Sequence, residues 1–491
     1  MLKISALFRL ANLFLIIALF AAALGLSRPA GATRSAAADW SARVDPWVIE
    51  TAAKGETEFL VLLVEQADLS AAAALPTKLE KGAYVYQALS GLAARTQGPT
   101  LAQLKRLGVE HRSYWVANMI WVRGGMVAVQ AMAQRGDVAH VYANPQVRLD
   151  EPTLAAPDLA EPLALEATDE IVWSIQKVQA DLVWAAGYRG QGEVVGGQDT
   201  GYMWDHPALK NQYRGWDGAA ADHDYNWHDA TLLEEDSAPC PDHSLAPCDS
   251  HGHGTHTMGT MVGEELDAED TPVMQTGMAP EARWIGCRNM YKDIESGTHV
   301  GTPATYAECY QWFIAPTDLS NQNPRSDLAP DVINNSWSCP DTEGCADPNV
   351  LFTVVENVRA AGILTVHSAG NKGSACYTIN TPAAIYDASY TVGNTTINDV
   401  LSDNSSRGSV TIDTSGRLKP DISAPGSSIT SSVPPELYGG AFYTVMYGTS
   451  MAAPHVAGLA ALLISADPTL AGQVNYLERI MNHTAAPVIV P

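Results

Sequence analysis

The chain has 491 residues, which is long enough for two or three domains and a large buried core. Its composition, 46% hydrophobic and 17% charged, is that of a globular protein and excludes a largely disordered one. A formal net charge of −25 repels phosphate backbones and anionic membranes, so we expect no nucleic-acid partner.

The N-terminus has the pattern of a secretory signal peptide. The basic residues Lys3 and Arg9 precede an apolar run over residues 10–26, and the small residues Ala30-Gly31-Ala32 follow it. A retained membrane anchor is the alternative, because the run is nearly long enough to span a bilayer. We predict that residues 1–32 are a signal peptide. The mature protein is then secreted, either extracellular or in the cell envelope, with no membrane association once the signal is removed.

Residues 33–150 have the pattern of a small separate domain. Strands are expected at 58–64, 113–123 and 138–142. Helices are expected at 84–94, after the break at Gly98-Pro99 as far as residue 107, and at 126–135. We interpret this as a β-α-β-β-α-β order, which is typical of a two-layer, ferredoxin-like α+β domain.

The remainder divides into a linker and a larger domain. Residues 151–170 are Pro, Ala, Leu and acidic residues without a period, which indicates an exposed linker. From residue 171 to 491, short apolar strands alternate with helices. The strands are expected at 192–196, 282–286, 331–334 and 362–366, and helices at 351–361 and 455–466. This alternation predicts an α/β fold with a doubly wound parallel sheet.

All seven cysteines lie beyond residue 239, which fits an oxidising compartment. Cys240 and Cys248 flank one short loop, and Cys339 and Cys345 flank another, so each pair is a candidate disulfide, although sequence leaves the connectivity open. Cys287, Cys309 and Cys376 remain. A metal site made of cysteines is disfavoured, because no C-x-x-C pair occurs.

Three segments carry residues suited to nucleophilic catalysis. Asp199 ends an apolar strand, His253 begins a glycine-rich helix, and Ser450 begins another helix, in which Pro454 is expected to fall in the first turn. A serine hydroxyl needs a neighbouring base, and that base needs a carboxylate to fix its tautomer and stabilise its charged form. We predict that Ser450 is the nucleophile, His253 the base and Asp199 the orienting carboxylate.

Asn371 is a candidate for stabilising the oxyanion that forms on attack. It follows an apolar strand and Gly370, where the chain can turn sharply. Its neutral amide donates a hydrogen bond without placing a charge beside His253. The backbone N–H of Ser450, at a helix N-terminus, is the second expected donor.

Taken together, these segments resemble the four signature segments of the subtilisin-like serine peptidases, or subtilases, in the family's order from residue 173 onwards. Residues 204–209 and 333–337 are most similar to the bacillopeptidase F-type bacterial members. The resemblance implies a subtilisin-like sheet, peptide-bond hydrolysis through an acyl-enzyme, and an N-terminal propeptide that acts as inhibitor and folding aid. The quoted segments are Asp199-Thr-Gly, His253-Gly-Thr-His256, Ala369-Gly-Asn371 and Gly448-Thr-Ser450-Met-Ala-Ala-Pro454.

The resemblance also assigns a substrate pocket and leaves some features open. Ser336, Trp337, Ser338 and Gly370 match the segments that line the primary specificity pocket, although relatives often have glycine at the position of Ser338. The acidic loop 264–270 lacks the family's Asn-rich calcium loop. We therefore expect no required cofactor and assign no metal ligand, with calcium binding by another geometry left open. Relatives usually end in a Gly-rich closing segment, which this sequence lacks before Pro491. Either the family's last structural elements are reduced here, or the natural chain continues beyond Pro491.

Two other functions compete with a secreted serine endopeptidase. His251, His253 and His256 have a spacing that could ligate zinc in a metallohydrolase, but that interpretation leaves Ser450 and Asp199 unused. A non-catalytic binding protein on a subtilase scaffold is the other alternative, although all three triad residues are present. The expected partners are protein or peptide substrates and the chain's own propeptide, with cleavage between residues 154 and 170, where the backbone is accessible.

Overall fold

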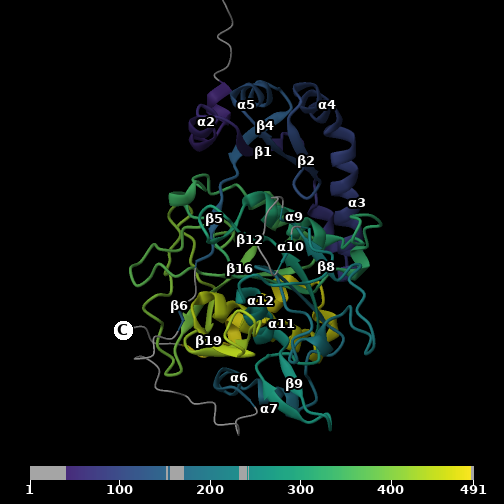
Figure 1. The fold of residues 1–491 in the computed structure, drawn as a ribbon, viewed down its shortest axis with the longest axis vertical. Coiled ribbons are helices and arrows are strands. Elements are labelled where there is room, and N and C mark those ends of the chain that lie inside the picture. The colour runs from purple at the N-terminus through teal and green to yellow at the C-terminus, as the bar shows by residue number, and fades with distance from the viewer. Residues whose placement is uncertain (1–39, 151–152, 155–170, 232–239, 242, 488–491) are drawn as a thin grey trace, which may run out of the picture. The chain divides into compact units, whose positions relative to one another are not determined.

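The structure is a computed structural model that describes residues 40–150, 153–154, 171–231, 240–241 and 243–487 (Figure 1). Residues Arg43–Pro491 form one compact unit. The predicted signal peptide and most of the predicted linker lie outside the described residues, so those predictions stay untested.

A seven-stranded sheet forms the centre of this unit. Its strand order is β17-β16-β15-β14-β7-β11-β8, and every neighbouring pair is parallel, which confirms the predicted α/β fold. The strands are β7 (Val194–Asp199), β8 (Trp227–Asp229), β11 (Arg283–Arg288), β14 (Val332–Asn335), β15 (Leu364–Ser368), β16 (Ser389–Thr395) and β17 (Ile422–Pro425).

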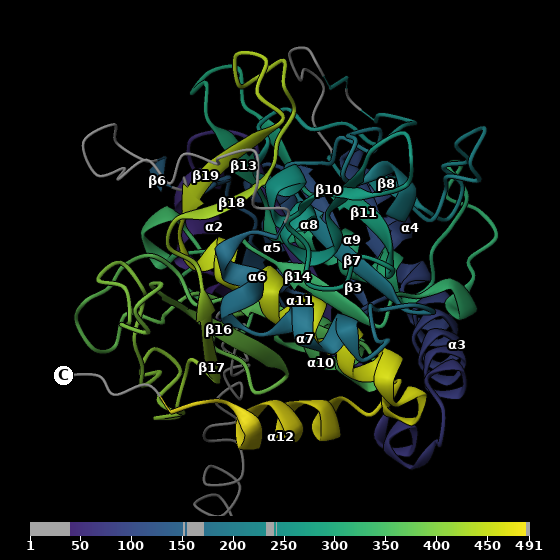
Figure 2. The same cartoon turned by 90° about the horizontal axis from the view of Figure 1, so that it is seen from below.

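Helices cover both faces of this sheet. Helices α8 (His253–Val262) and α11 (Thr449–Ala466) pack against each other on one face, as Figure 2 shows. Helices α9 (Pro303–Ile314) and α10 (Phe352–Ala360) belong to the opposite hydrophobic core. Adjacent strand residues divide between the two cores: Val332 packs with the α8 and α11 side, and Ile333 packs with the α9 and α10 side.

The sheet has a topological switch point between β7 and β14. From β7 the later strands β8 and β11 extend the sheet in one direction, and from β14 the strands β15, β16 and β17 extend it in the other. The crevice at the carboxyl ends of such strands is where doubly wound proteins bind ligands. Asp199 is the last residue of β7 and therefore lies at this point.

Buried amides join the carboxyl ends of the central strands. Gln198 donates from Nε2 to Asn335 Oδ1 at 2.6 Å and accepts at Oε1 from Asn289 Nδ2 at 2.9 Å. Asn335 Nδ2 donates in turn to the carbonyl of Val366 at 3.0 Å. All of these amide side chains are buried, so their hydrogen bonds replace the water that they would otherwise need. The network connects strands β7, β14 and β15 immediately behind the switch point.

Residues 43–150 contain a second, antiparallel sheet with strand order β2-β3-β1-β4. The predicted strand at 113–123 is wrong as a single element, because it is a hairpin of two strands. Residues 115–118 form the turn, and Asn118 has a φ of 46°, a left-handed conformation that asparagine tolerates better than most residues. The elements are α2 (Pro46–Ala52), β1 (Thr57–Leu63), α3 (Lys78–Thr96), α4 (Gly98–Leu107), β2 (Glu110–Tyr114), β3 (Met119–Gly124), α5 (Met126–Ala133) and β4 (Val138–Ala143).

The remaining elements are short or peripheral, except for the C-terminal helix. They are β5 (Val147–Arg148), β6 (Thr153–Leu154), α6 (Trp173–Lys177), α7 (Ala180–Ala185), β9 (Glu264–Leu266), β10 (Pro272–Gln275), β12 (Met290–Lys292), β13 (His299–Gly301), β18 (Ile429–Ser432), β19 (Tyr443–Tyr447) and α12 (Val474–Thr484). Six 3-10 helices occur among the described residues: Trp40–Arg43, Ser70–Ala74, Lys210–Gln212, Ser326–Leu328, Asp341–Glu343 and Pro468–Leu470.

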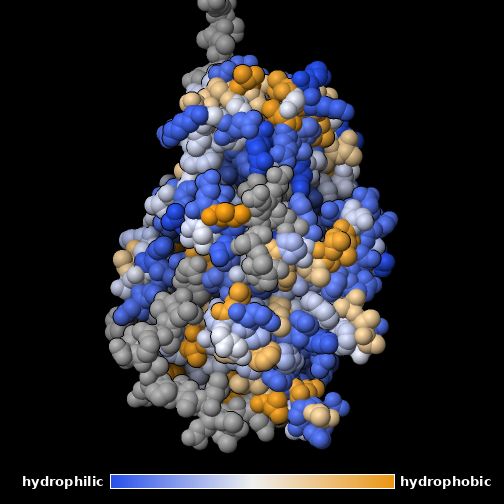
Figure 3. Space-filling model, viewed as in Figure 1, coloured by the Kyte–Doolittle hydropathy of each residue, from blue (hydrophilic) through white to orange (hydrophobic). Residues whose placement is uncertain are grey.

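The visible surface is predominantly hydrophilic, with hydrophobic residues scattered over it (Figure 3). Within the described residues, α11 is the one helix that is long and apolar enough to cross a membrane. Because 78% of that helix is buried inside the fold, it is a core helix.

Three disulfides are present: Cys240–Cys248, Cys287–Cys309 and Cys339–Cys345. The first and third are the loop pairs that the spacing indicated. The second joins β11 to α9 and could not be predicted from the sequence, because only the fold brings those two positions together. Cys376 is exposed and is the one free cysteine in the described part of the chain.

Removing the Cys287–Cys309 disulfide should destabilise the protein. The bridge closes a loop with a sequence separation of 22, for which loop-closure entropy predicts about 3 kcal/mol. The double variant Cys287→Ala/Cys309→Ala should therefore lower the free energy of unfolding by about that amount in urea titrations. Cys376→Ser is the matched control and should leave the unfolding midpoint unchanged. An unfolding midpoint of the double variant equal to that of the wild-type protein would contradict the prediction.

Candidate active site

Asp199 and His253 are in direct contact at the switch point. Asp199 Oδ1 lies 2.7 Å from His253 Nδ1, and both side chains are buried. The same oxygen accepts the backbone N–H of Thr200 at 2.8 Å, which fixes the carboxylate. With Nδ1 donating to the carboxylate, the imidazole holds its basic lone pair on Nε2.

Gly254 allows this contact, because it lets the start of α8 approach β7 closely. A Cβ atom added at Gly254 would lie 2.1 Å from the carbonyl oxygen of Gly201 and 3.0 Å from Asp199 Cβ. Any larger residue would push α8, and His253 with it, away from Asp199. The glycine of the His-Gly-Thr-His segment is therefore a packing requirement of the site.

A buried carboxylate, Asp249, organises the loop and the first turn that carry His253. It accepts five hydrogen bonds: from Thr200 Oγ1, from the backbone N–H groups of His251, Gly252 and Thr255, and from Thr255 Oγ1, at 2.6–3.0 Å. Two of these donors, the N–H groups of Gly252 and Thr255, are backbone groups at the helix N-terminus, which lack intrahelical partners. Asp249 was not among the residues predicted from the sequence. Its position four residues before His253, next to an expected helix start, was the available signal.

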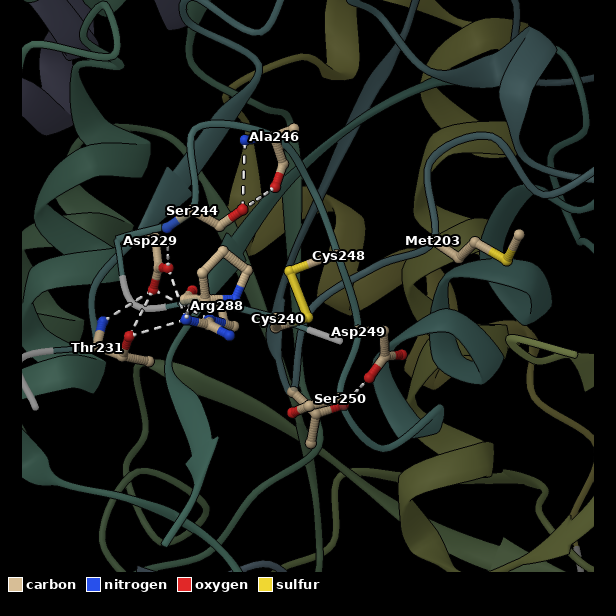
Figure 4. The surroundings of a disulfide bond; sticks show 12 residues. Met203, Asp229, Thr231, Cys240, Ser244, Ala246, Cys248, Asp249, Ser250 and Arg288 are labelled. Carbon is tan, nitrogen blue, oxygen red and sulfur yellow. Dashed lines mark hydrogen bonds and ion pairs between the residues drawn. A yellow bond between two sulfur atoms is a disulfide. The ribbon is translucent and has the colours of Figure 1, made fainter. Parts of the chain in front are cut away.

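The loop that ends at Asp249 is further restrained by the Cys240–Cys248 disulfide and a buried ion pair (Figure 4). Arg288 Nη2 lies 2.7 Å from Asp229 Oδ2 and also donates to the carbonyl of Pro241 at 2.9 Å. Arg288 is the residue of β11 that pairs with Asp199 of β7. The loop before His253 is therefore anchored to the strand beside Asp199.

Ser450 lies in the first turn of α11, the helix that packs against α8. Thr449, just before it, is held by Asn371: the Oδ1 atom of Asn371 accepts the backbone N–H of Thr449 at 2.9 Å and its hydroxyl at 3.0 Å. Because Oδ1 is occupied in this way, the Nδ2 group is the remaining polar end of the amide. A Cβ atom at Gly448 would lie 3.3 Å from Nδ2, so glycine keeps that end uncovered.

Pro454 does not lie in the first turn of its helix, as predicted, but in the second. The helix begins at Thr449, and a residue at position 454 would normally donate its N–H to the carbonyl of Ser450. Proline has no such N–H. The Ser336 hydroxyl donates to that carbonyl instead, at 3.0 Å, and so binds the start of α11 to the end of β14.

The predicted pocket residues gather near the start of α11, but they differ in exposure. Ser336 and Gly370 both contact its first turn, Gly370 through its N–H to Thr449 Oγ1 at 3.1 Å. The Trp337 ring is 2% exposed and stacks on Tyr306 with ring centroids 3.9 Å apart, so its side chain lies beneath the surface. Ser338 is partly exposed and its carbonyl accepts a hydrogen bond from Tyr306. The role of this segment in binding substrate stays a prediction.

The other histidines near the site are held in structural hydrogen bonds. His256 Nε2 bonds to the carbonyl of Ile429 at 3.0 Å, His367 Nε2 to the Tyr310 hydroxyl at 2.7 Å, and His455 Nδ1 to the carbonyl of Met451 at 2.8 Å. Burial lowers the pKa of His256 and of His367 to about 3, and that of His455 to about 4. All three are therefore neutral at ordinary pH.

The three-histidine zinc arrangement is not supported by these contacts. His253 is directed to Asp199 through Nδ1, His256 is bonded to a backbone carbonyl, and the His251 ring packs against His299 with centroids 4.7 Å apart. The acidic loop 264–270 is also engaged. Glu264 pairs with Arg189, and Asp267 accepts the N–H groups of Glu269 and Thr271 within its own turn.

Comparison with protein families matches residues 190–489 to the subtilase family. Bacillopeptidase F of Bacillus subtilis (strain 168) is 34% identical over 438 residues, which cover 87% of this chain and 28% of that protein. The major intracellular serine protease of the same strain is 30% identical over 300 residues, covering 60% of this chain and 76% of that protein. Subtilisin DY of Bacillus licheniformis is 30% identical over 302 residues, covering 61% of this chain and 86% of that protein. The family model covers more than half of the chain, and the resemblance inferred from the four sequence segments is confirmed: this chain belongs to the subtilase family of serine proteases.

Proposed function

We propose that this protein is a secreted serine endopeptidase in which Ser450 is the nucleophile, His253 the general base and Asp199 the carboxylate that orients it. The observation that carries the proposal is the 2.7 Å contact between Asp199 and His253 at the start of α8, the helix packed against the Ser450 helix. Secretion is proposed from the N-terminal sequence pattern together with the three disulfides.

In the proposed mechanism, His253 Nε2 takes the proton from Ser450 Oγ as that oxygen attacks the peptide carbonyl carbon. The tetrahedral oxyanion accepts hydrogen bonds from the Ser450 N–H and from Asn371 Nδ2. His253 then gives its proton to the leaving amine, and an acyl-enzyme remains. Water attacks this ester with His253 again taking a proton, and the acid is released as Ser450 regains its hydrogen.

Asn371 is suited to the oxyanion role because its orientation is set by the protein. The two hydrogen bonds from Thr449 fix the Oδ1 end, which assigns the amide nitrogen as the donor. A donor held in place before the reaction needs no rearrangement when charge develops. No metal or cofactor enters this mechanism, and calcium binding remains an open alternative without assigned ligands.

We propose that residues 33–150 are a propeptide that inhibits the enzyme and aids its folding. Arg112 donates two hydrogen bonds to Glu308 of α9, at 2.6 and 2.8 Å, and Tyr114 Oη donates to the same carboxylate at 3.0 Å. Gln311 Oε1 accepts the backbone N–H of Trp115 at 2.6 Å. These contacts join the turn region of the antiparallel sheet to α9, a helix of the main domain.

A non-catalytic binding protein on the same scaffold is the remaining alternative. It would not require the Asp199–His253 contact, the Thr449–Asn371 hydrogen bonds or the close packing at Gly254. All of these features belong to one site, so we favour the enzyme.

Replacing the nucleophile tests the proposal directly. Ser450→Ala should abolish hydrolysis of peptide substrates and should leave the full-length precursor uncut, because one hydroxyl performs both reactions. Hydrolysis rates and the mass of the purified chain are the measurements. Normal maturation of the isolated variant would show that another protease makes the cut.

Activity should fall on acidification. His253 must be neutral to accept a proton, and an unperturbed imidazole has a pKa of about 6.5, so kcat/KM should decline between about pH 7.5 and 5.5 as pH falls. The pKa values of His256 and His367 are about 3, so neither contributes a proton uptake in that window. A rate that stays flat to about pH 4 would indicate a carboxylate base instead.

Asp249 should act as a positioning residue for His253. Asp249→Asn keeps the shape of the side chain but removes its charge. It also replaces one carboxylate oxygen, which accepts hydrogen bonds, by an NH2 group, which cannot accept them from the N–H and hydroxyl of Thr255. Losing charge-assisted bonds worth about 1.5–3 kcal/mol should lower kcat about tenfold or more while KM changes little. Asp267→Asn, in the exposed acidic loop, is the matched control. A defect confined to KM would contradict the assignment.

The isolated N-terminal segment should inhibit the mature enzyme competitively. We expect the proposed propeptide, residues 33–150, to inhibit hydrolysis of a small peptide at micromolar concentration. Arg112→Ala should weaken inhibition, because it leaves the buried Glu308 carboxylate without its guanidinium partner. Arg106→Ala, an exposed arginine of α4, should not. No inhibition by the unaltered segment would refute the propeptide assignment.

A further inference from the structure

We propose that this enzyme prefers substrates with an acidic residue immediately before the cleaved bond, and that Lys372 is the residue that recognises it. The proposal rests on the endopeptidase function proposed above and adds its substrate class. The chain's own segment Val147–Asp150 serves as the template, with aliphatic side chains at the fourth and second positions before the bond.

This segment is paired to the main domain as an extended substrate would be. Strand β5 is antiparallel to β13, with Val147 opposite Gly301 and Arg148 opposite Val300, and the Leu149 N–H donates to the His299 carbonyl at 2.8 Å. Addition of a strand to an exposed edge is a common mode of peptide recognition, in which backbone bonds give affinity and alternate side chains give specificity.

The chain is held again just past this point. Strand β6 (Thr153–Leu154) pairs antiparallel with β19, opposite Tyr447 and Met446. The three residues that follow β19 are Gly448, Thr449 and the proposed nucleophile Ser450. Residues 147–149 are therefore bound at the β13 edge and residues 153–154 at the β19 edge, and Asp150 is the first residue after the β13 pairing.

The side chains of the segment alternate between buried and exposed. Val147 is fully buried in a small cluster with Cys339 and Cys345. Arg148 is exposed, and Leu149 is buried in the core on the α9 side of the sheet. Two apolar subsites thus receive the first and third residues of the segment, and the second faces solvent.

The fourth residue, Asp150, faces a cation. Its Oδ1 lies 3.9 Å from Lys372 Nζ, and Lys372 directly follows the proposed oxyanion donor Asn371. The Lys372 backbone is fixed by its N–H donating to Ser406 Oγ at 3.0 Å. The lysine side chain is 66% exposed, so we expect discrimination by charge to be modest and weakened by salt.

The pairing of the segment Val147–Asp150 predicts a maturation site upstream of residues 154–170, the range expected from the sequence. The sequence pattern identified an accessible linker, but strand pairing selects which residues reach the site. We expect cleavage on the carboxyl side of Asp150, so that the mature enzyme begins at Glu151.

Peptide hydrolysis by the self-processed enzyme tests the preference. The substrates are acetyl-Val-Arg-Leu-X-aminomethylcoumarin, with X as Asp, Asn or Lys. For an exposed ion pair we expect kcat/KM to be about two- to fivefold higher for Asp than for Asn. Lys372→Glu should reverse the order and favour Lys, whereas Lys177→Glu, the same charge change on α6, should not. Asn hydrolysed as fast as Asp, with no reversal in Lys372→Glu, would overturn the proposal.

A charge swap in the full-length precursor gives an independent measurement. Asp150→Lys should slow self-processing by about two- to fivefold or more, and the double variant Asp150→Lys/Lys372→Glu should restore it. A mature N-terminus other than Glu151 in the wild type, or no restoration in the double variant, would overturn the inference. A wild type that neither processes itself nor cleaves any of the peptides would instead refute the proposed endopeptidase function.

Discussion

The close approach of helix α8 to the carboxyl end of strand β7 is the constraint on which the site depends. Asp199 belongs to the strand and His253 to the helix, so their 2.7 Å contact exists only while the two elements touch. Gly254 permits the approach because no side chain stands between them. Asp249 maintains it by binding the helix start and Thr200 to one buried carboxylate. Asp199, His253 and these supporting residues therefore act as one structural unit.

Buried polar side chains around this unit hydrogen-bond to one another and to the backbone. The amides of Gln198, Asn335 and Asn289 join the strand ends behind Asp199, and neighbouring histidines bond to backbone carbonyls or a tyrosine. Each of these hydrogen bonds favours a single arrangement of the side chains that it joins. Burial also keeps these histidines uncharged, so they place no competing positive charge beside His253.

Much of this organisation could be predicted from local sequence. Apolar runs marked the parallel strands, and the four segments marked the family and the residues that the fold brings to the switch point. Other features depend on partners distant in sequence. The Cys287–Cys309 disulfide and the Ser336 hydroxyl that replaces the missing Pro454 N–H require β11 with α9, and β14 with α11, to be adjacent in space. The hairpin within 113–123 was missed because its turn has strand-like composition, despite Asn118.

The proposed mechanism requires Ser450 to carry the reactive hydroxyl. The most direct measurement is to treat the mature protein with a fluorophosphonate, digest it, and locate the added mass by tandem mass spectrometry. We expect one adduct per molecule, on the peptide that contains Ser450, and we expect labelling to be lost below about pH 5.5, where an ordinary histidine is protonated. An adduct on a different residue, or full hydrolytic activity in a protein that the reagent does not label, would contradict it.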